Sequence, residues 1–198
     1  MTDIDCQLSR QESDLILVEQ IIPDYRLDDI IAYDRPKVII VAGQPGACAA
    51  KLVRELFVEL QGDAVLIDPE DLADYHPLVR RLRRDHPHAW TAHTATDALI
   101  WAIRLMYHTA SLMKHVILDL SFTDGSLVSR DLVKAMKDRG YAVEVRAVAA
   151  HRLESEIALH VRFVDGMANE GYGRYISKAV HDSAYELLPE RLNAIQGR

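Results

Sequence analysis

The chain has 198 residues, of which 49% are apolar and 27% are charged, and its formal net charge is −7. This length allows one sizeable core, and the acidic balance disfavours nucleic acid as a partner because no basic field would neutralise its phosphates. We expect no membrane partner, because no apolar stretch is long enough to span a bilayer and the first residues lack a basic-then-apolar signal. Two distant cysteines, Cys6 and Cys48, suit a reducing compartment, so we expect a cytoplasmic location.

Residues 1–34 are expected to form an N-terminal helical segment. Ser9 and Glu12 have the spacing of a capping box, which marks the start of a helix. Apolar residues follow at helical spacing up to Ile22. Pro23 is expected to end this helix, because proline has no amide hydrogen to donate.

The remaining residues, 35–198, alternate predicted strands and helices. Apolar, β-branched runs predict four strands, at residues 37–42, 64–67, 115–120 and 142–149. Helical spacing predicts helices at residues 48–60, 94–113, 126–138, 153–163 and 177–188. This order predicts an α/β fold in one domain, a parallel sheet with helices on both faces. Ligands bind such sheets beyond the carboxyl ends of the strands.

The most informative segment is residues 37–51, which read KVIIVAGQPGACAAK. A strand, a glycine turn and a helix together are typical of a phosphate-binding loop, in which backbone amides and the helix N-terminus bind the anion. The candidates for nucleotide binding are Gly43, Gln44, Pro45, Gly46, Ala47, Cys48, Ala49 and Ala50. A complete Walker A pattern would have glycine, lysine and serine or threonine at positions 48, 49 and 50. The alternative interpretation is an ordinary strand-to-helix turn, and Lys51, about 200° around the helix from the lysine position, is expected to face solvent.

Acidic residues follow the second and third predicted strands. Asp68 and Glu70 could accept a proton from an attacking hydroxyl or hold Mg²⁺, and equally one of them could simply cap the next helix. Asp119, followed by Ser121, is placed to hold Mg²⁺ or to position a substrate. Aspartate is also common where a loop begins, so this pattern alone does not decide between the two.

Two arginines late in the chain are candidates for anion binding: Arg162 on a predicted helix and Arg174 in a glycine-bounded segment. An arginine above a phosphate site stabilises charge during phosphoryl transfer, although a surface ion pair is the simpler interpretation of each one alone. The arginines at positions 80–84 are interpreted as a solvated helix face. The histidines match no zinc spacing, and we assign no metal cage to them.

Together these segments resemble the zeta-toxin family, the P-loop kinases of bacterial toxin–antitoxin systems. The resemblance covers roughly residues 35–192 and depends on the order of several short blocks. These blocks are AGQPGA at 42–47, IDPEDL at 67–72, YHP at 75–77, VILDLS at 116–121, GY at 140–141, Arg162, GRY at 173–175, AVHD at 179–182 and LP at 188–189.

The resemblance implies a P-loop kinase-like fold with a helical lid. It implies transfer of a phosphate from ATP or GTP, with Mg²⁺, to the 3′-hydroxyl of the amino sugar in UDP-N-acetylglucosamine, and a cognate antitoxin that blocks the nucleotide site. Glu70 takes the place of the family's catalytic aspartate, or Asp68 does if the register slips. Arg162 and Arg174 match the arginines that clamp the transferring phosphate.

The chain departs from the family pattern in the loop. Ala49 and Ala50 replace the phosphate-binding lysine and the Mg²⁺-binding hydroxyl, and Cys48 replaces the last glycine. Losing one such preorganised group typically lowers a rate by about 10²–10³. Two hypotheses therefore remain: a strongly impaired UDP-N-acetylglucosamine kinase, whether Ala49 is natural or introduced, and a non-catalytic pseudokinase that binds nucleotide, UDP-sugar or an antitoxin-like protein.

Overall fold

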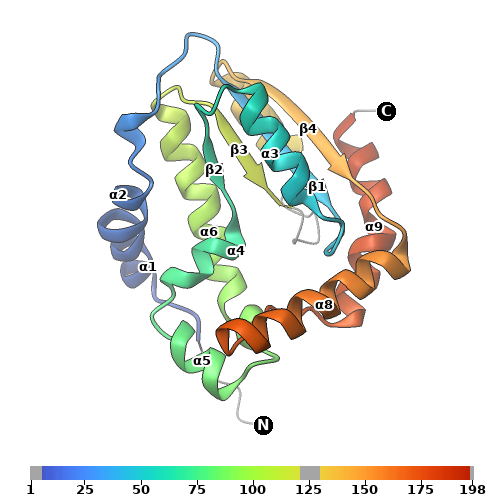
Figure 1. The fold of residues 1–198 in the computed structure, drawn as a ribbon. Coiled ribbons are helices and arrows are strands. Elements are labelled where there is room, and N and C mark those ends of the chain that lie inside the picture. Colours follow the sequence, from blue (N-terminus) through green and yellow to red (C-terminus); the bar gives the residue numbers. More distant parts are fainter. Residues whose placement is uncertain (1–5, 121–129, 197–198) are drawn as a thin grey trace.

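A parallel four-stranded sheet forms the centre of the computed structural model, which describes residues 6–120 and 130–196 (Figure 1). In the described residues the strands follow the order β2-β3-β1-β4. Their bounds are β1 Lys37–Gly43, β2 Val65–Ile67, β3 Val116–Asp119 and β4 Ala142–Val148. In the register, Val38 of β1 pairs with Val116 of β3 and Val143 of β4. The four predicted strands and their parallel pairing are confirmed.

Helices surround this sheet. The long ones are α3 (Ala49–Glu59), α6 (Trp90–Ser111), α7 (Arg130–Asp138), α8 (Arg152–Glu170) and α9 (Lys178–Gln196). Shorter elements are α4 (Pro69–Leu72), α5 (Val79–Asp85) and the 3-10 turns η2 (Leu27–Asp29) and η3 (Ala73–Tyr75). None of the helices in the described ranges is long and apolar enough to cross a membrane.

The sheet is covered on both faces, as predicted. Val38 and Ile40 of β1 are fully buried and belong to one apolar cluster with residues of α6, α7 and the N-terminal segment. Ile39 and Val41 point the other way and are buried with the apolar face of α3. This alternation follows from the two-residue period of a strand. The chain therefore has the predicted α/β, P-loop kinase-like architecture.

The N-terminal helix is longer than predicted. It consists of α1 (Arg10–Ile16), a π-helical turn η1 (Leu17–Ile21) and α2 (Ile22–Asp24), so it continues through Pro23. Pro23 has no amide hydrogen to donate, and the helix has a π-helical turn, with its altered hydrogen-bond pattern, directly before this residue. Ile16, Leu17 and Ile21 are buried in the cluster shared with α6. The ring nitrogen of Trp101 donates to the carbonyl of Ser13 over 3.0 Å, which attaches this segment to α6.

The C-terminal helices also exceed their predicted lengths. Helix α8 continues through Gly166 to Glu170, and α9 continues through Pro189 to Gln196. Gly166 serves close packing instead of a turn, because a Cβ there would lie 2.7 Å from the carbonyl of Tyr172. The helix predicted from position 126 begins at Arg130 in the described residues, and positions 126–129 lie outside them.

The prediction that the arginines at positions 80–84 form a solvated face holds for Arg80, Arg81 and Arg84, which are exposed, and is wrong for Arg83. The guanidinium of Arg83 stacks over the rings of Trp90 and Tyr172, at 4.4 and 3.8 Å from their centroids, and also pairs with Asp74. Arg83 therefore packs α5 against α6 and the segment after α8, and it is not part of a solvated face.

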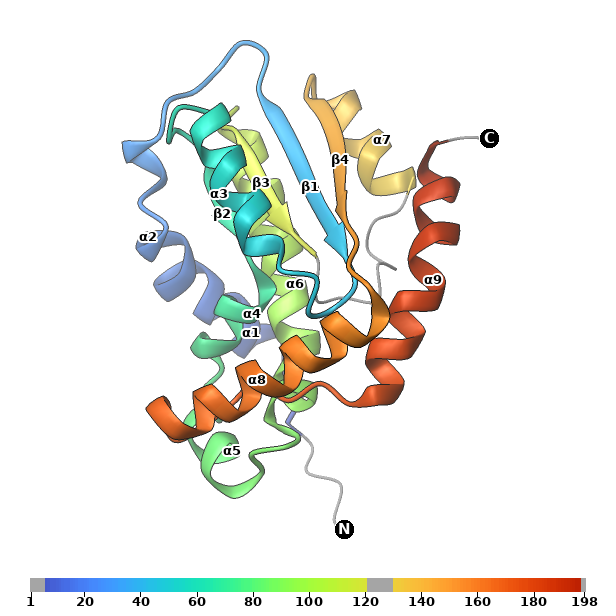
Figure 2. The same ribbon diagram turned by 45° about the vertical axis from the view of Figure 1, so that its right-hand side comes forward.

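Helix α8 crosses the end of the molecule where the parallel strands terminate. Both views show α8 running past the carboxyl end of β1 and the loop that follows it (Figures 1 and 2). This is the position expected of the predicted helical lid, and it places α8 at the edge where α/β sheets bind ligands.

Candidate active site

The loop of residues 43–48 connects β1 to α3 and is fixed against the start of α8. Gly46 has a φ of +83° and Cys48 a φ of +61°, both in the left-handed region. Position 46 requires glycine, because a Cβ there would lie 2.2 Å from the backbone oxygen of Ser155 in α8. The side-chain amide of Gln44, 1% exposed, donates to the carbonyl of Ala150 over 2.7 Å.

The loop offers backbone amides to an anion, and no charged side chain stands at the lysine position. Helix α3 has no side-chain hydrogen bond at its N-cap, and of its first three amides only that of Lys51 donates within the loop, to the carbonyl of Cys48, so the amides of Ala49 and Ala50 are left to an anion or water. Cys48, Ala50 and Lys51 are exposed, which agrees with the prediction for Lys51. Ala49, in contrast, is 4% exposed and belongs to the apolar cluster that includes Val53. A lysine at position 49 would have to extend out of this packing to reach an anion.

Glu70 brings the two candidate arginines together. Nη2 of Arg162 and Nη1 of Arg174 donate to different carboxylate oxygens of Glu70, each over 2.8 Å. Arg174 also donates to Asp71 over 3.2 Å. The Glu70 side chain is 14% exposed, so two guanidinium groups hold a largely buried carboxylate. We call Glu70, Arg162 and Arg174 the arginine clamp.

Helix α8 contacts both the loop, through Ser155, and the clamp, through Arg162. Arg162 is seven residues along α8 from Ser155, which is roughly 10 Å at the helical rise. Ser155 contacts the loop at Gly46, whereas Arg162 reaches Glu70 at the start of α4. An extended phosphate chain could therefore contact both groups.

Asp68 lies beside the clamp at the end of β2. Its carboxylate caps α4 by accepting the amide hydrogen of Glu70 over 2.8 Å, which is the structural role foreseen for it. Burial, followed by the charges of Glu70, Asp119 and Asp71, raises the pKa of Asp68 to about 8. Asp119, 6% exposed at the end of β3, is thus close enough to interact with Asp68 electrostatically. Ser121, the other candidate on this strand end, lies outside the described residues.

The raised pKa of Asp68 predicts a pH-dependent stability. The folded protein binds this proton more tightly than the unfolded chain does, so the free energy of unfolding should fall as pH rises from about 4 to about 8. Asp68→Asn keeps a capping acceptor and removes the titration. Between about pH 5 and pH 9, urea titrations should show wild type losing roughly 2–5 kcal/mol relative to Asp68→Asn. Parallel pH profiles of the two proteins would contradict this prediction.

A cavity of about 510 Å³ opens next to the clamp. Glu70, Arg174 and Asp119 lie in its wall, and apolar residues of α6 line much of the rest. The wall formed by residues 174–177 is attached to α6, because Thr91 donates to the carbonyl of Tyr175 over 2.9 Å. This volume and this mixture of apolar surface with a few polar groups are typical of small-molecule sites.

Sequence reasoning missed the contribution of the N-terminal segment to this region. Burial, then nearby Tyr75, Asp71 and Asp68, raises the pKa of Tyr25. The hydroxyl of Tyr75 donates to Asp24 over 2.9 Å. Tyr75 is part of a block that carried the family resemblance, but no pattern around Asp24 and Tyr25 indicated that they reach the acidic residues.

Ser155, His181 and Asp182 have the hydrogen bonds of a catalytic triad without its accessibility. Ser155 Oγ lies 2.7 Å from His181 Nε2, and His181 Nδ1 lies 3.1 Å from Asp182. Ser155 and His181 are 0% and 1% exposed, so no substrate reaches the hydroxyl. Asp182 also pairs with Arg152 and Lys178. The arrangement attaches α9 to α8, which gives the AVHD block a structural role.

The same residues contribute to a possible metal-binding group. Glu156, His181 and Asp182 each bring a ligand atom within 4.8 Å of the others. The ammonium of Lys178 already lies 3.1 Å from Glu156 and 3.3 Å from Asp182, so a cation of the protein compensates these carboxylates. We assign no metal to this group.

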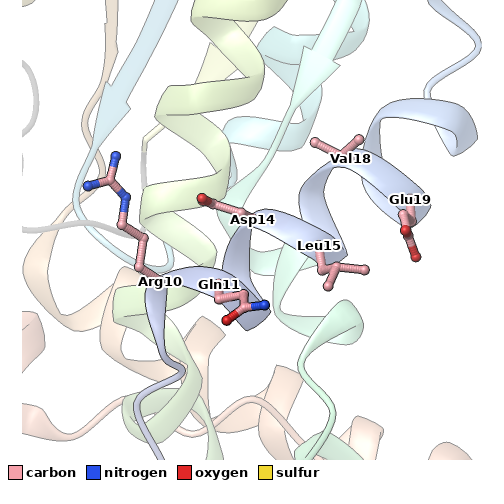
Figure 3. A pocket seen from close by; sticks show the side chains of 6 residues that line it. All are labelled: Arg10, Gln11, Asp14, Leu15, Val18 and Glu19. Carbon is pink, nitrogen blue, oxygen red and sulfur yellow. The ribbon is translucent and has the colours of Figure 1, made fainter.

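A second hollow, of about 580 Å³, lies along the N-terminal helix, and we assign no binding site to it. Figure 3 shows that all six of its side chains project from one helical stretch and do not face an opposing wall. They are Arg10, Gln11, Asp14, Leu15, Val18 and Glu19.

Comparison with known proteins supports the assignment of the fold. The family model described as zeta toxin matches residues 25–198. A structure from the PezAT chromosomal toxin–antitoxin system of Streptococcus pneumoniae has a TM-score of 0.71 and 15% identity, over 98% of this chain and 99% of that chain. A Chloroflexus aurantiacus protein proposed to be a kinase has a TM-score of 0.55 and 14% identity, over 80% of each chain. The structure of AvrRxo1-ORF1:-ORF2 with ATP has a TM-score of 0.55 and 15% identity, over 94% of this chain and 55% of that one. The search of curated proteins found no match.

Proposed function

Because the chain belongs to the zeta toxin family, we propose that it is a sugar-nucleotide kinase with a strongly reduced rate. It transfers the terminal phosphate of ATP or GTP to the amino sugar of a UDP-activated substrate such as UDP-N-acetylglucosamine. The observation that supports this most is the arginine clamp, in which two distant arginines meet on one acid at the wall of the cavity. Such a kinase would act where nucleotide sugars are made, so a cytoplasmic location is part of this proposal.

In this proposal the backbone of residues 43–50 binds the phosphates of the nucleotide, apart from Pro45, which has no amide hydrogen, and Ala47, whose amide donates to the carbonyl of Gln44. Arg162 and Arg174 bind the phosphoryl group in transfer. The sugar hydroxyl oxygen attacks the terminal phosphorus, the bond from that phosphorus to the bridging oxygen breaks, and the nucleoside diphosphate leaves. The hydroxyl proton passes to the Glu70 carboxylate. Asp68 is less suited to accept it, because a carboxyl with a pKa of about 8 is already protonated at neutral pH.

The acidic residues near the clamp fit a magnesium ion. Asp119 and Asp68 end adjacent strands and interact electrostatically, and oxygen ligands are those that Mg²⁺ prefers. Asp119 would hold the ion, Asp68 would join it only on losing its proton, and Ala50 contributes no hydroxyl to it. When bound, Mg²⁺ neutralises part of the phosphate charge.

A second candidate function is binding without catalysis. The burial of Ala49 and the left-handed Cys48 favour it, because position 49 is built into the core and position 48 adds a side chain where phosphate would approach. A protein of this kind would bind nucleotide, UDP-sugar or an antitoxin-like protein. Neither candidate involves nucleic acid or a membrane.

The test is a transfer assay with radiolabelled ATP and UDP-N-acetylglucosamine. We expect ATP to bind the chain with a Kd weaker than about 100 μM. Ala49→Lys combined with Ala50→Ser should raise transfer by about 10² or more. Ala50→Lys is the matched control, since it adds the same charge at an exposed neighbouring position. Binding of either ligand without transfer in any variant would support the second candidate. No binding and no transfer would contradict the kinase and would leave, of the second candidate, only the binding of an antitoxin-like protein.

A further inference from the structure

The outer side of α8 carries an apolar stripe, interrupted near its centre by the exposed His160. Of the large apolar side chains that are exposed in the described residues, five lie on this one helix. They are Leu153 (60% exposed), Ile157 (61%), Val161 (53%), Val164 (61%) and Met167 (37%). Their spacings of three and four residues place them along one face of the helix.

The opposite face of α8 packs against the rest of the molecule. Ser155 and Leu159 are buried against the loop and α9, and Arg162 reaches Glu70. Both views place α8 at the periphery, with its length running across the end of the sheet (Figures 1 and 2). A helix with an apolar stripe on its solvent side, in addition to its buried side, is typical of a protein-binding surface.

The charges beside the stripe indicate what covers it. Glu154 and Asp165 are exposed and lie eleven residues apart, about three turns, so they border the stripe on the same side. The two arginines of α8 do not offset them, because Arg152 pairs with Asp182 and Arg162 pairs with Glu70. The border is therefore acidic.

A second copy of the chain is a poor partner for this surface. In an antiparallel pair of identical helices each border meets itself, so Glu154 of one copy would face Asp165 of the other. Like charges at such positions are unfavourable, and each copy carries a net charge of −7. A helix with basic borders would instead form favourable pairs with both acids.

We propose that the outer face of α8 binds an amphipathic helix of a partner protein, with apolar residues at heptad spacing and lysine or arginine at its borders. This proposal does not depend on phosphoryl transfer, because it uses no residue of the loop or the arginine clamp.

The test uses two synthetic helical peptides with identical leucine seams, one with lysine and one with glutamate at the border positions. We expect the lysine peptide to bind the full chain at least about tenfold more tightly than the glutamate peptide. Val161→Asp should reduce binding of the lysine peptide at least about tenfold, and Val58→Asp, at an 80% exposed apolar position on α3, should not.

The double variant Glu154→Lys/Asp165→Lys should reverse the preference between the peptides, which a general effect on folding would not do. Circular dichroism confirms that each variant is folded. Equal binding of the two peptides, or no binding of either, would overturn the proposal. Self-association of the wild type that Val161→Asp abolishes would assign the stripe to a second copy, and binding to anionic vesicles through the stripe would assign it to a membrane.

Discussion

Gly46→Ala is expected to lower the free energy of unfolding by about 3 kcal/mol or more. Two costs combine at this position. The backbone has a φ of +83°, which disfavours any residue with a Cβ, and the added Cβ would lie 2.2 Å from the backbone oxygen of Ser155. A backbone oxygen cannot move aside as a flexible side chain can, so α8 and the loop would have to separate. Urea denaturation followed by circular dichroism measures the loss.

Gly62→Ala separates these two costs. Gly62 has a φ of +77°, similar to that of Gly46, but nothing lies within 4 Å of the Cβ that alanine would add. This variant should lose only about 1–2 kcal/mol, the cost of the left-handed backbone. The difference between the two variants measures the contact between the loop and α8. Equal losses would show that α8 does not press on the loop in solution.

The sheet was predicted well because each strand is a short apolar run that can be recognised from neighbouring residues alone. The runs that became β1 and β3 are apolar on both faces, which is what a central parallel strand requires. The helix ends were harder to predict. Gly166 and Pro189 look like signals that end a helix, yet tertiary packing carries α8 and α9 past them.

The candidate site was predicted in its members but not in its pairing. Patterns and the family resemblance selected Glu70, Arg162 and Arg174. They could not show that the carboxylate of Glu70 forms ion pairs with both arginines. That pairing joins residues up to 104 positions apart and depends on how α8 lies over α4. The burial of Ala49 was equally hidden, because an alanine fits a core and a solvent-facing position alike.

The pairing within the arginine clamp has a consequence for anion binding. A phosphate that approaches Arg162 and Arg174 meets guanidinium groups already bound to a carboxylate of the same charge sign. The incoming anion must therefore displace Glu70 or share the arginines with it. Glu70→Gln removes the competing charge and keeps nearly the same shape, so the arginines become available to the anion.

We therefore expect Glu70→Gln to bind ATP and inorganic pyrophosphate about tenfold or more tightly than wild type, as measured by calorimetry. The variant should also be less stable by about 1–3 kcal/mol, because two partly buried guanidinium groups lose their anionic partner. Asp71→Asn is the matched control: it makes the same change of charge at a 68% exposed acid that contacts Arg174 over 3.2 Å. Its affinity for ATP should change less than about threefold.

The direction of the change in affinity separates two roles for Glu70. If the carboxylate competes with phosphate for the arginines, its removal tightens anion binding. If it mainly orients them, its removal leaves them disordered and weakens binding. In the background of Ala49→Lys/Ala50→Ser, Glu70→Gln should also stop transfer to the sugar, because an amide cannot accept the hydroxyl proton. Tighter ATP binding together with lost transfer in the same variant would identify Glu70 as both competitor and base, whereas weaker binding would leave it only a structural partner of the arginines.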